Sequence, residues 1–176
     1  MLIIQMWLGT LWFLKLSKHI LTIMIKINVF SEDILWNKRL KNRDLFFNKI
    51  TSNFPNKYKF INKKIYLTLL LSNNKNIKKL NNKFRKKNKH TDILSFPFDN
   101  FSLKKKELYL GDIIISYNYM NNPKNLTSLE FKKKVTKIFI HGFLHLLGYD
   151  HIKNNDYKNM ISEEKKIFKS VLKILT

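Results

Sequence analysis

Three of the five histidines in the 176-residue chain lie within the segment HGFLHLLGYDH, residues 141–151. His141 and His145 are four residues apart, so on a helix their side chains project from one face about one turn apart. Gly148 stands where a left-handed residue often ends a helix, and the chain can then turn back and bring His151 to the same point. A single histidine on an apolar helix would indicate only a core residue, but this spacing predicts three imidazoles around one metal ion.

The chain has no cysteine, which excludes disulfides and thiolate ligands and favours a reducing, cytoplasmic location. Three neutral imidazoles suit Zn²⁺, and three protein ligands leave a fourth position for water, as in catalytic zinc sites. Spacing alone does not distinguish Zn²⁺ from Ni²⁺ or Fe²⁺. We expect one catalytic Zn²⁺ per chain.

The same segment fits the histidine spacing of metzincin peptidases. Those enzymes need a glutamate directly after the first histidine as general base, and Gly142 occupies that position. Because glycine cannot transfer a proton, the sequence disfavours peptide hydrolysis and indicates a different reaction at the metal.

The chain carries 34 basic and 12 acidic residues, a net charge of +22. This excess favours an anionic partner, most simply a nucleic acid. The arginines are Arg39, Arg43 and Arg85, and the remaining basic residues are lysines in a chain also rich in asparagine and isoleucine. AT-rich coding would produce the same bias, and charge runs are often only solvated faces. Charge therefore supports nucleic-acid binding without establishing it.

Hydrophobic periodicity predicts alternating strands and helices without internal repeats. Strands are expected at 24–30, at 63–72 as a buried central strand, at 91–99 as an edge strand containing Pro97, and at 107–117 with a bulge or close approach at Gly111. Helices are expected at 34–54, from a Ser72 cap to Leu80, from a Thr127–Glu130 capping box onward, and at 157–175. The order predicts an α+β fold, a small mixed β-sheet packed by helices, with the zinc site at the C-terminal end of a central helix.

Residues 1–23 have a different character from the rest of the chain. The apolar run 1–14 is shorter than the roughly 20 residues of a membrane span. Lys15 and Lys18 follow this run instead of preceding it, unlike a secretory signal. We expect residues 1–23 to be an apolar N-terminal extension, either non-native or a peripheral arm, and residues 24–176 to form a single domain that does not associate with membranes.

The segment HGFLHLLGYDH resembles the signature of the bacterial YbeY endoribonuclease family, the rRNA maturation factors. Residues 81–98, NNKFRKKNKHTDILSFPF, are similar to a second block of that family in which an arginine precedes a T-D-V-L-S-F-P run, and ELYLGDIIIS at 107–116 is similar to the strand that follows. The resemblance covers most of residues 24–175. Ile93 replaces a common valine and His90 a common proline.

The resemblance implies a metal-dependent hydrolase that cuts single-stranded RNA, matures the 3′ end of small-subunit rRNA and acts in ribosome quality control. Its partners would be rRNA and the ribosomal small subunit or its proteins. It also implies that His141, His145 and His151 are the zinc ligands and that Arg85 is the functional arginine, so Arg85 and His141 are the expected catalytic residues. Phosphodiester hydrolysis needs an activated water, which zinc supplies, and charge stabilisation at phosphate, which a guanidinium adds.

The general base is not defined by the sequence. Asp150 is expected either to orient an imidazole or to stabilise a turn, and Asp112 either approaches the helix or satisfies backbone groups. His90 is expected in a loop, and His19 lies in the extension.

Aromatic side chains near these motifs could stack on bases of single-stranded RNA. For Phe96 and Phe98 the first expectation is a place in the core, whereas Tyr149, at the turn, is the better candidate for exposure. The alternative to the nuclease is a ribosome-assembly factor that binds RNA or protein and uses zinc structurally.

Overall fold

The structure is a computed structural model that describes residues 25–58, 60, 63–99 and 106–175. The expected extension at 1–23 lies outside the described residues. In chain order the elements are β1 (Ile25–Ser31), α2 (Leu35–Arg39), α3 (Arg43–Ser52), the 3₁₀ turn η1 (Asn56–Tyr58), β2 (Lys64–Ser72), α4 (Asn74–Arg85), β3 (Ile93–Pro97), β4 (Glu107–Ser116), α5 (Tyr117–Met120), α6 (Ser128–Leu146), α7 (Asn154–Val171) and the 3₁₀ turn η2 (Leu172–Ile174).

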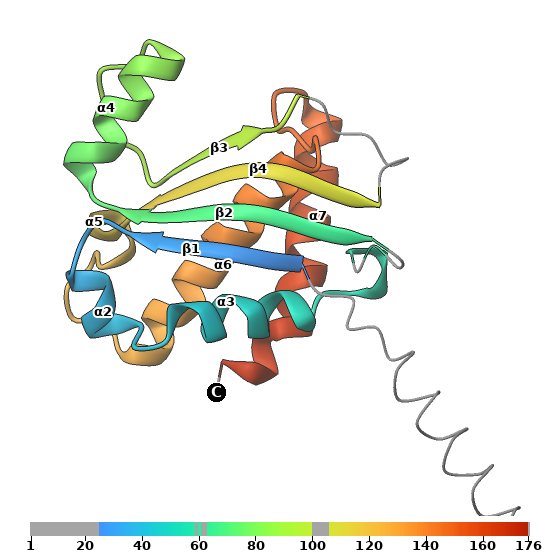
Figure 1. Cartoon of the computed structure of the whole chain (residues 1–176), viewed down its shortest axis with the longest axis horizontal. Coiled ribbons are helices and arrows are strands. Elements are labelled where there is room, and N and C mark those ends of the chain that lie inside the picture. Colours follow the sequence, from blue (N-terminus) through green and yellow to red (C-terminus); the bar gives the residue numbers. More distant parts are fainter. Residues whose placement is uncertain (1–24, 59, 61–62, 100–105, 176) are drawn as a thin grey trace, which may run out of the picture.

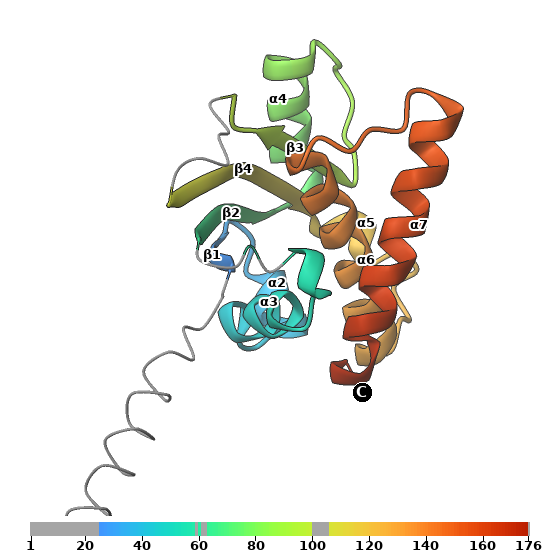
Figure 2. The ribbon, with the colours of Figure 1, turned by 90° about the vertical axis from the view of Figure 1, so that its right-hand side faces the viewer.

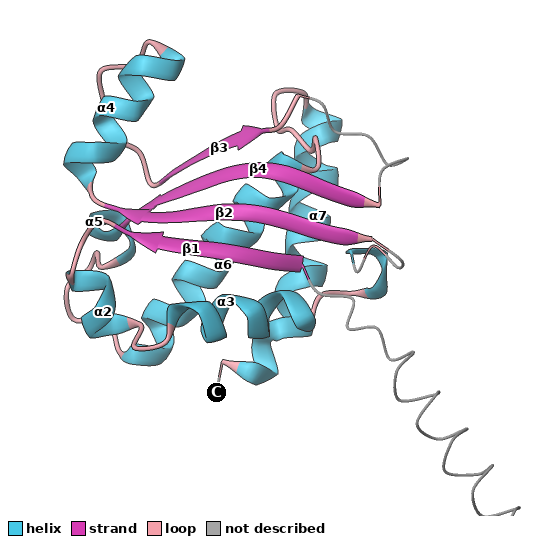
Figure 3. Cartoon of the chain, viewed as in Figure 1, coloured by secondary structure: helices cyan, strands magenta, loops and turns pink. Residues whose placement is uncertain are grey.

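The described strands form one four-stranded sheet in the order β1-β2-β4-β3 (Figure 3). β1, β2 and β4 are parallel, and β3 pairs antiparallel with β4 at the edge. The mixed sheet confirms the predicted α+β class. β2 is the buried central strand that its apolar run predicted, and β3 is the edge strand, ending at Pro97, where a missing N–H costs no ladder bond.

The helices cover the sheet unequally. α3 contacts β1, α6 contacts β3 and β4, and α7 packs on α6, so these helices lie together on one side of the sheet (Figures 1 and 2). The main core between them contains buried aromatic rings such as Phe47, Phe139 and Phe143. On the other face, Ile77 of α4 makes a smaller buried cluster with Leu94 and Ile114. α6 is therefore the central helix of the larger layer.

Gly111 lies at an irregularity in the β2–β4 pairing. Tyr66 pairs with Tyr109 and Thr68 with Asp112, so β4 contains one extra residue. Gly111 has a φ of +131°, and an added Cβ would lie 2.1 Å from the carbonyl oxygen of Phe96. Both readings of this glycine, as a bulge and as a close approach, are confirmed.

The predicted helix at 34–54 is wrong in one respect, since it is two helices. The chain leaves the helical region at Leu40, and the Asn42 side chain then caps α3 by accepting a hydrogen bond from the Leu45 amide. The start of α4 also differs. Asn73 accepts from the Asn76 amide and is the cap, while Ser72 ends β2 and donates to Glu32.

The remaining helix boundaries agree better with the sequence. Thr127 and Glu130 form the predicted capping box at the start of α6. α4 continues past Leu80 to Arg85 and ends at Lys86 in a left-handed conformation. None of the helices in the described part of the chain combines the length and the apolar character that crossing a bilayer requires.

Two aromatic residues differ in placement. Phe96 packs at the edge of the smaller cluster under α4, whereas Phe98 is 44% exposed. The core assignment is therefore wrong for Phe98. Position 98 follows the last residue of β3, and its ring contacts that of Tyr109 edge-on, with the ring centres 5.7 Å apart.

Candidate metal centre

The three histidines converge at the C-terminal end of α6. His141 and His145 lie on its last two turns, and their Nε2 atoms are 3.1 Å apart. His151 returns from the following turn, so that one ring nitrogen from each residue lies within 4.8 Å of the others. Nitrogens held 2.0–2.1 Å from a tetrahedral ion lie about 3.3 Å apart. The donor set and its spacing fit a metal ion, and the predicted convergence is confirmed.

The turn after α6 explains how His151 returns. The Tyr149 amide donates to the Leu144 carbonyl and the Gly148 amide donates to the His145 carbonyl, each at 3.0 Å, which is the Schellman pattern. Gly148 has a φ of +85°, and an added Cβ would meet nothing within 4 Å. Glycine is therefore required here for its backbone conformation and not for space.

Two hydrogen bonds orient the imidazoles. Nδ1 of His145 lies 2.9 Å from the Tyr149 carbonyl oxygen, and Nδ1 of His141 lies 2.6 Å from Oε1 of Glu164. Because these oxygens accept, Nδ1 carries the proton in each ring and Nε2 is left as the ligand atom. Burial, together with the neighbouring His141, lowers the pKa of His145 below its ordinary value, which keeps that ring neutral and able to bind a metal.

Glu164 was not found from the sequence. It lies 23 residues after His141 on α7, and no spacing rule relates two residues on separate helices. Asp150 was expected either to orient an imidazole or to stabilise a turn. Its Oδ1 accepts from the His151 amide at 2.7 Å, which supports the role in the turn.

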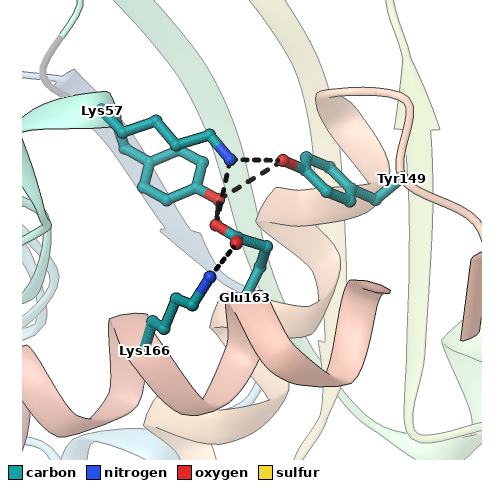
Figure 4. Close-up of polar contacts among 5 residues, drawn as sticks. Lys57, Tyr149, Glu163 and Lys166 are labelled. Atoms are coloured by element: carbon teal, nitrogen blue, oxygen red, sulfur yellow. Dashed lines mark hydrogen bonds and ion pairs between the residues drawn. The ribbon is translucent and has the colours of Figure 1, made fainter. Parts of the chain in front are cut away.

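Tyr149 anchors the turn from its other end. Its hydroxyl lies 3.1 Å from Nζ of Lys57 and 3.5 Å from the Tyr58 hydroxyl (Figure 4). Glu163 accepts from Tyr58 and pairs with Lys57 at 3.1 Å and Lys166 at 2.8 Å. The expected exposure of Tyr149 is wrong, since its ring is half-buried in this cluster. The turn is thereby tied to η1 and α7.

The cluster around Tyr149 also shifts ionisation. Hydrogen bonds from Lys166, Tyr58 and Lys57 lower the pKa of Glu163 to about 2. Burial and the same carboxylate raise the pKa of Tyr58 well above its ordinary value. Glu163 is therefore ionised and Tyr58 protonated at neutral pH.

Arg85 ends α4 and is exposed. Its Nη2 donates to the Ser95 carbonyl at 3.2 Å, and its guanidinium carbon lies 5.9 Å from the centre of the Phe96 ring. Within the described residues, no hydrogen bond joins it to the histidines. A guanidinium has five N–H donors, so this contact leaves donors for a ligand.

Gly142 lies where α6, which carries the histidines, packs against β3, which contacts Arg85. A Cβ added there would lie 2.5 Å from Cδ1 of Ile93 and 3.0 Å from Oγ of Ser95. The missing side chain therefore lets β3 lie close against the turn of α6 that carries His141. From the sequence, Gly142 indicated only that a peptidase base is absent. The structure shows in addition that a glycine is needed here for the packing of β3 on α6.

The other residues considered from the sequence lie elsewhere. Ile113 faces Gly142, so the preceding Asp112 projects from the opposite face of the sheet, where its Oδ1 accepts from the Tyr109 hydroxyl at 2.5 Å. Asp112 does not approach the histidines. Nδ1 of His90 lies 3.0 Å from the Tyr119 hydroxyl, and His90 is a loop residue as expected. His19 is outside the described residues.

Comparisons with known proteins agree with the sequence motifs. Residues 32–172 match the family model described as Endoribonuclease YbeY. The Endoribonuclease YbeY of Pelagibacter ubique is 65% identical over 148 residues, which are 84% of this chain and 97% of that protein. The Endoribonuclease YbeY of Fusobacterium nucleatum is 34% identical over 151 residues, 82% of this chain and 87% of its own.

A solved structure supports the same relationship at the level of the fold. The solution structure of TM1509 from Thermotoga maritima is 27% identical and superimposes with a TM-score of 0.51, covering 82% of this chain and 88% of that one. The family match and the relatives above span most of the described chain, including the histidine segment. The chain therefore belongs to the YbeY endoribonuclease family and is a nuclease of the hydrolase class.

Proposed function

We propose that this protein is a zinc-dependent endoribonuclease that hydrolyses phosphodiester bonds in single-stranded precursor rRNA. The substrate would include the 3′ end of small-subunit rRNA, in late maturation and ribosome quality control. The partners would be the small subunit or its proteins, in the cytoplasm, and residues 24–176 would act as a single domain. The observation that carries the proposal is the convergence of three imidazole nitrogens at the end of α6 in a chain of this family.

His141, His145 and His151 would hold one Zn²⁺. When bound there, the ion would lower the pKa of a water ligand and withdraw charge from a phosphate oxygen. Glu164 and the Tyr149 carbonyl hold the Nδ1 protons of two of these rings, so the ligand nitrogens need not reorient when the ion binds. Preorganised ligands of this kind favour tight and specific binding.

The number of protein ligands supports catalysis over a structural role. Among the described residues the cluster contains three ligand side chains, without a fourth His, Cys, Asp or Glu. Structural zinc sites are usually closed by four protein ligands, whereas catalytic sites leave one position open. This observation favours the nuclease over an assembly factor with a structural zinc.

Arg85 would act on the phosphate. Its guanidinium is permanently charged and planar, so it can hold two phosphate oxygens at once. The contact with Ser95 orients the side chain along β3, the strand that packs against Gly142. The net charge of +22 would strengthen attraction of the RNA toward this region.

The test compares metal content with cleavage of a single-stranded precursor RNA. His145→Ala should lose the metal and all cleavage, and Lys64→Ala, which removes an exposed side chain of β2 outside the cluster, should lose neither. Arg85→Ala should keep the metal and lose cleavage by a factor of 100 or more on the scale of other charge-stabilising groups, while Arg43→Ala should remain active.

Two results would contradict the proposal. Cleavage by a metal-free Arg85→Ala preparation would mean that neither group performs the reaction. Tight, salt-sensitive RNA binding with bound zinc but no turnover would instead support the assembly factor.

A further inference from the structure

A pocket of about 270 Å³ lies beside the histidine cluster along α6. His141 and Glu164 belong both to its wall and to the metal centre. Its remaining lining comes from α5, the segment before β3, and the middle of α6. A ligand in this pocket would therefore lie next to whatever occupies the metal centre.

Two lysines stand on the wall formed by α6. Lys134, Lys137 and His141 are spaced by three and four residues, so they share one face of the helix. With a rise of 1.5 Å per residue, Lys137 lies about 6 Å and Lys134 about 10 Å from His141 along the axis. Nζ of Lys134 donates to the Asn122 carbonyl at 2.5 Å, and Nζ of Lys137 lies 5.0 Å from the centre of the Phe168 ring. Along the helix axis, both lysine positions are therefore within the length of one or two nucleotides from His141.

The remaining lining of the pocket suits a base and a ribose. The side chains of Met120 and Ile138 and the ring of Tyr119 contribute its apolar and aromatic surface. The Tyr119 hydroxyl is bonded to His90, which holds the ring in place. Oδ1 of Asp92 accepts from the Thr91 hydroxyl and the Ile93 amide, each at 2.9 Å, which fixes a carboxylate at the pocket. A carboxylate accepts hydrogen bonds from base amino groups and ribose hydroxyls.

We infer that this pocket binds one nucleotide of the RNA strand next to the bond that is cut, with Lys134 and Lys137 contacting its phosphate and Tyr119 its base. The inference rests on the proposed function. The charges argue for a whole nucleotide and not a free phosphate, because Asp92 and Glu164 oppose the two lysines. A nucleotide carries both an anionic phosphate and hydrogen-bond donors, and the pocket lining offers both lysines and carboxylates.

The main test is binding of a short, fluorescein-labelled single-stranded RNA to the full-length purified protein, followed by anisotropy at several salt concentrations. Lys134→Gln/Lys137→Gln should weaken binding about 10-fold or more. It should also lower the slope of log K against log salt by about 0.7, the contribution of one neutralised phosphate on a single strand, because both lysines contact the same phosphate. Lys41→Gln/Lys49→Gln makes the same change in net charge at the other end of α6, near Ser128, and should change the slope little.

The base contact is tested separately. Tyr119→Leu should weaken binding about 5-fold or more, because a stacked ring is lost, and Tyr119→Phe, which keeps the ring but loses the bond to His90, should recover most of that loss. Cross-linking of the wild-type protein to RNA containing 4-thiouridine does not depend on the folding of a variant, and should label peptides from α5 or the middle of α6.

The outcomes separate this inference from the proposed function. Equal losses in the two double-lysine variants, or cross-links confined to α4 and the open sheet face, would overturn the subsite even if zinc-dependent cleavage is found. If these binding results hold but the chain does not cleave RNA, the nucleotide subsite is supported. The proposed catalytic role of the three histidines next to it is then contradicted.

Discussion

The three histidines reach one point through a single stretch of eleven residues, whereas Arg85 reaches β3 only through the packing of α4 beside the sheet. The first arrangement depends on helix periodicity and one glycine turn. The second depends on tertiary contacts among three elements. The metal centre is therefore a local structure that the fold supports, and the proposed phosphate clamp is a product of the fold itself.

Substitution of Gly142 should have the largest effect, because it should disturb the packing of β3 while leaving the histidine spacing unchanged. Gly142→Val would push Ile93 and Ser95 away from α6, and overpacking of this kind costs about 1–3 kcal/mol in the free energy of unfolding. The histidine spacing on α6 is unchanged, so zinc affinity should stay within a few-fold of the wild type while cleavage falls. Urea unfolding, zinc competition with a chelator, and cleavage rates measure the three quantities.

Gly142→Ala provides a graded control, because its smaller side chain needs a smaller displacement of Ile93. Its losses of stability and cleavage should lie between those of the wild type and the valine variant. If Gly142→Val lost zinc and cleavage in parallel, the two regions would not be separable in the way the structure indicates.

Substitution of Glu164 tests the metal centre separately from the packing of β3. Glu164→Gln removes the charge that accepts the Nδ1 proton of His141, and loss of such an orienting carboxylate typically weakens metal binding 10- to 100-fold. Chelator competition measures this effect without any cleavage assay. Glu107→Gln, which changes an exposed pair with Lys64, is the matched control, and wild-type zinc affinity in Glu164→Gln would refute the orienting role.

The smallest expected effect concerns Glu163 and the polar cluster around Tyr149 that anchors the turn after α6. The pKa of Glu163 falls from an ordinary value of 4.5 to about 2 in the folded protein. Its contribution to stability is therefore complete above pH 4.5 and is lost as the pH falls toward 2. Because Lys57 and Lys166 are 60% and 63% exposed, solvent screening should limit the contribution to about 1 kcal/mol.

Glu163→Gln should accordingly flatten the loss of stability between pH 4.5 and 2 relative to the wild type, as measured by urea unfolding across that range. Glu107→Gln again serves as the control and should retain the wild-type slope. Identical slopes in wild type and Glu163→Gln would show that another carboxyl group dominates acid unfolding.

The sequence predicted those features whose cause is local. The four-residue spacing of His141 and His145, the left-handed Gly148, the Thr127–Glu130 box and the edge position of Pro97 each follow from a short stretch of residues. The mixed sheet followed from the order of the strands and helices. Each of these predictions needs only periodicity or the conformational preference of one residue.

Features that depend on how elements dock were missed. Glu164 contacts His141 because α7 packs on α6, and Tyr149 is covered because η1 and α7 meet at the turn. The break between α2 and α3 was also missed. The capping of α4 by Asn73 was missed because Ser72 and Asn73 are adjacent polar residues, and each can cap a helix. Local preference alone does not choose between them.

The direction of α6 has an electrostatic consequence for the reaction. Its capped N-terminus faces away from the histidines, so its C-terminal end, which carries about half a negative charge, points at the metal centre. That end attracts a dication and repels an approaching phosphodiester. A metal ion held by the three histidines would reverse the sign of the local potential, so we expect RNA to bind this end of the helix more strongly with metal than without it.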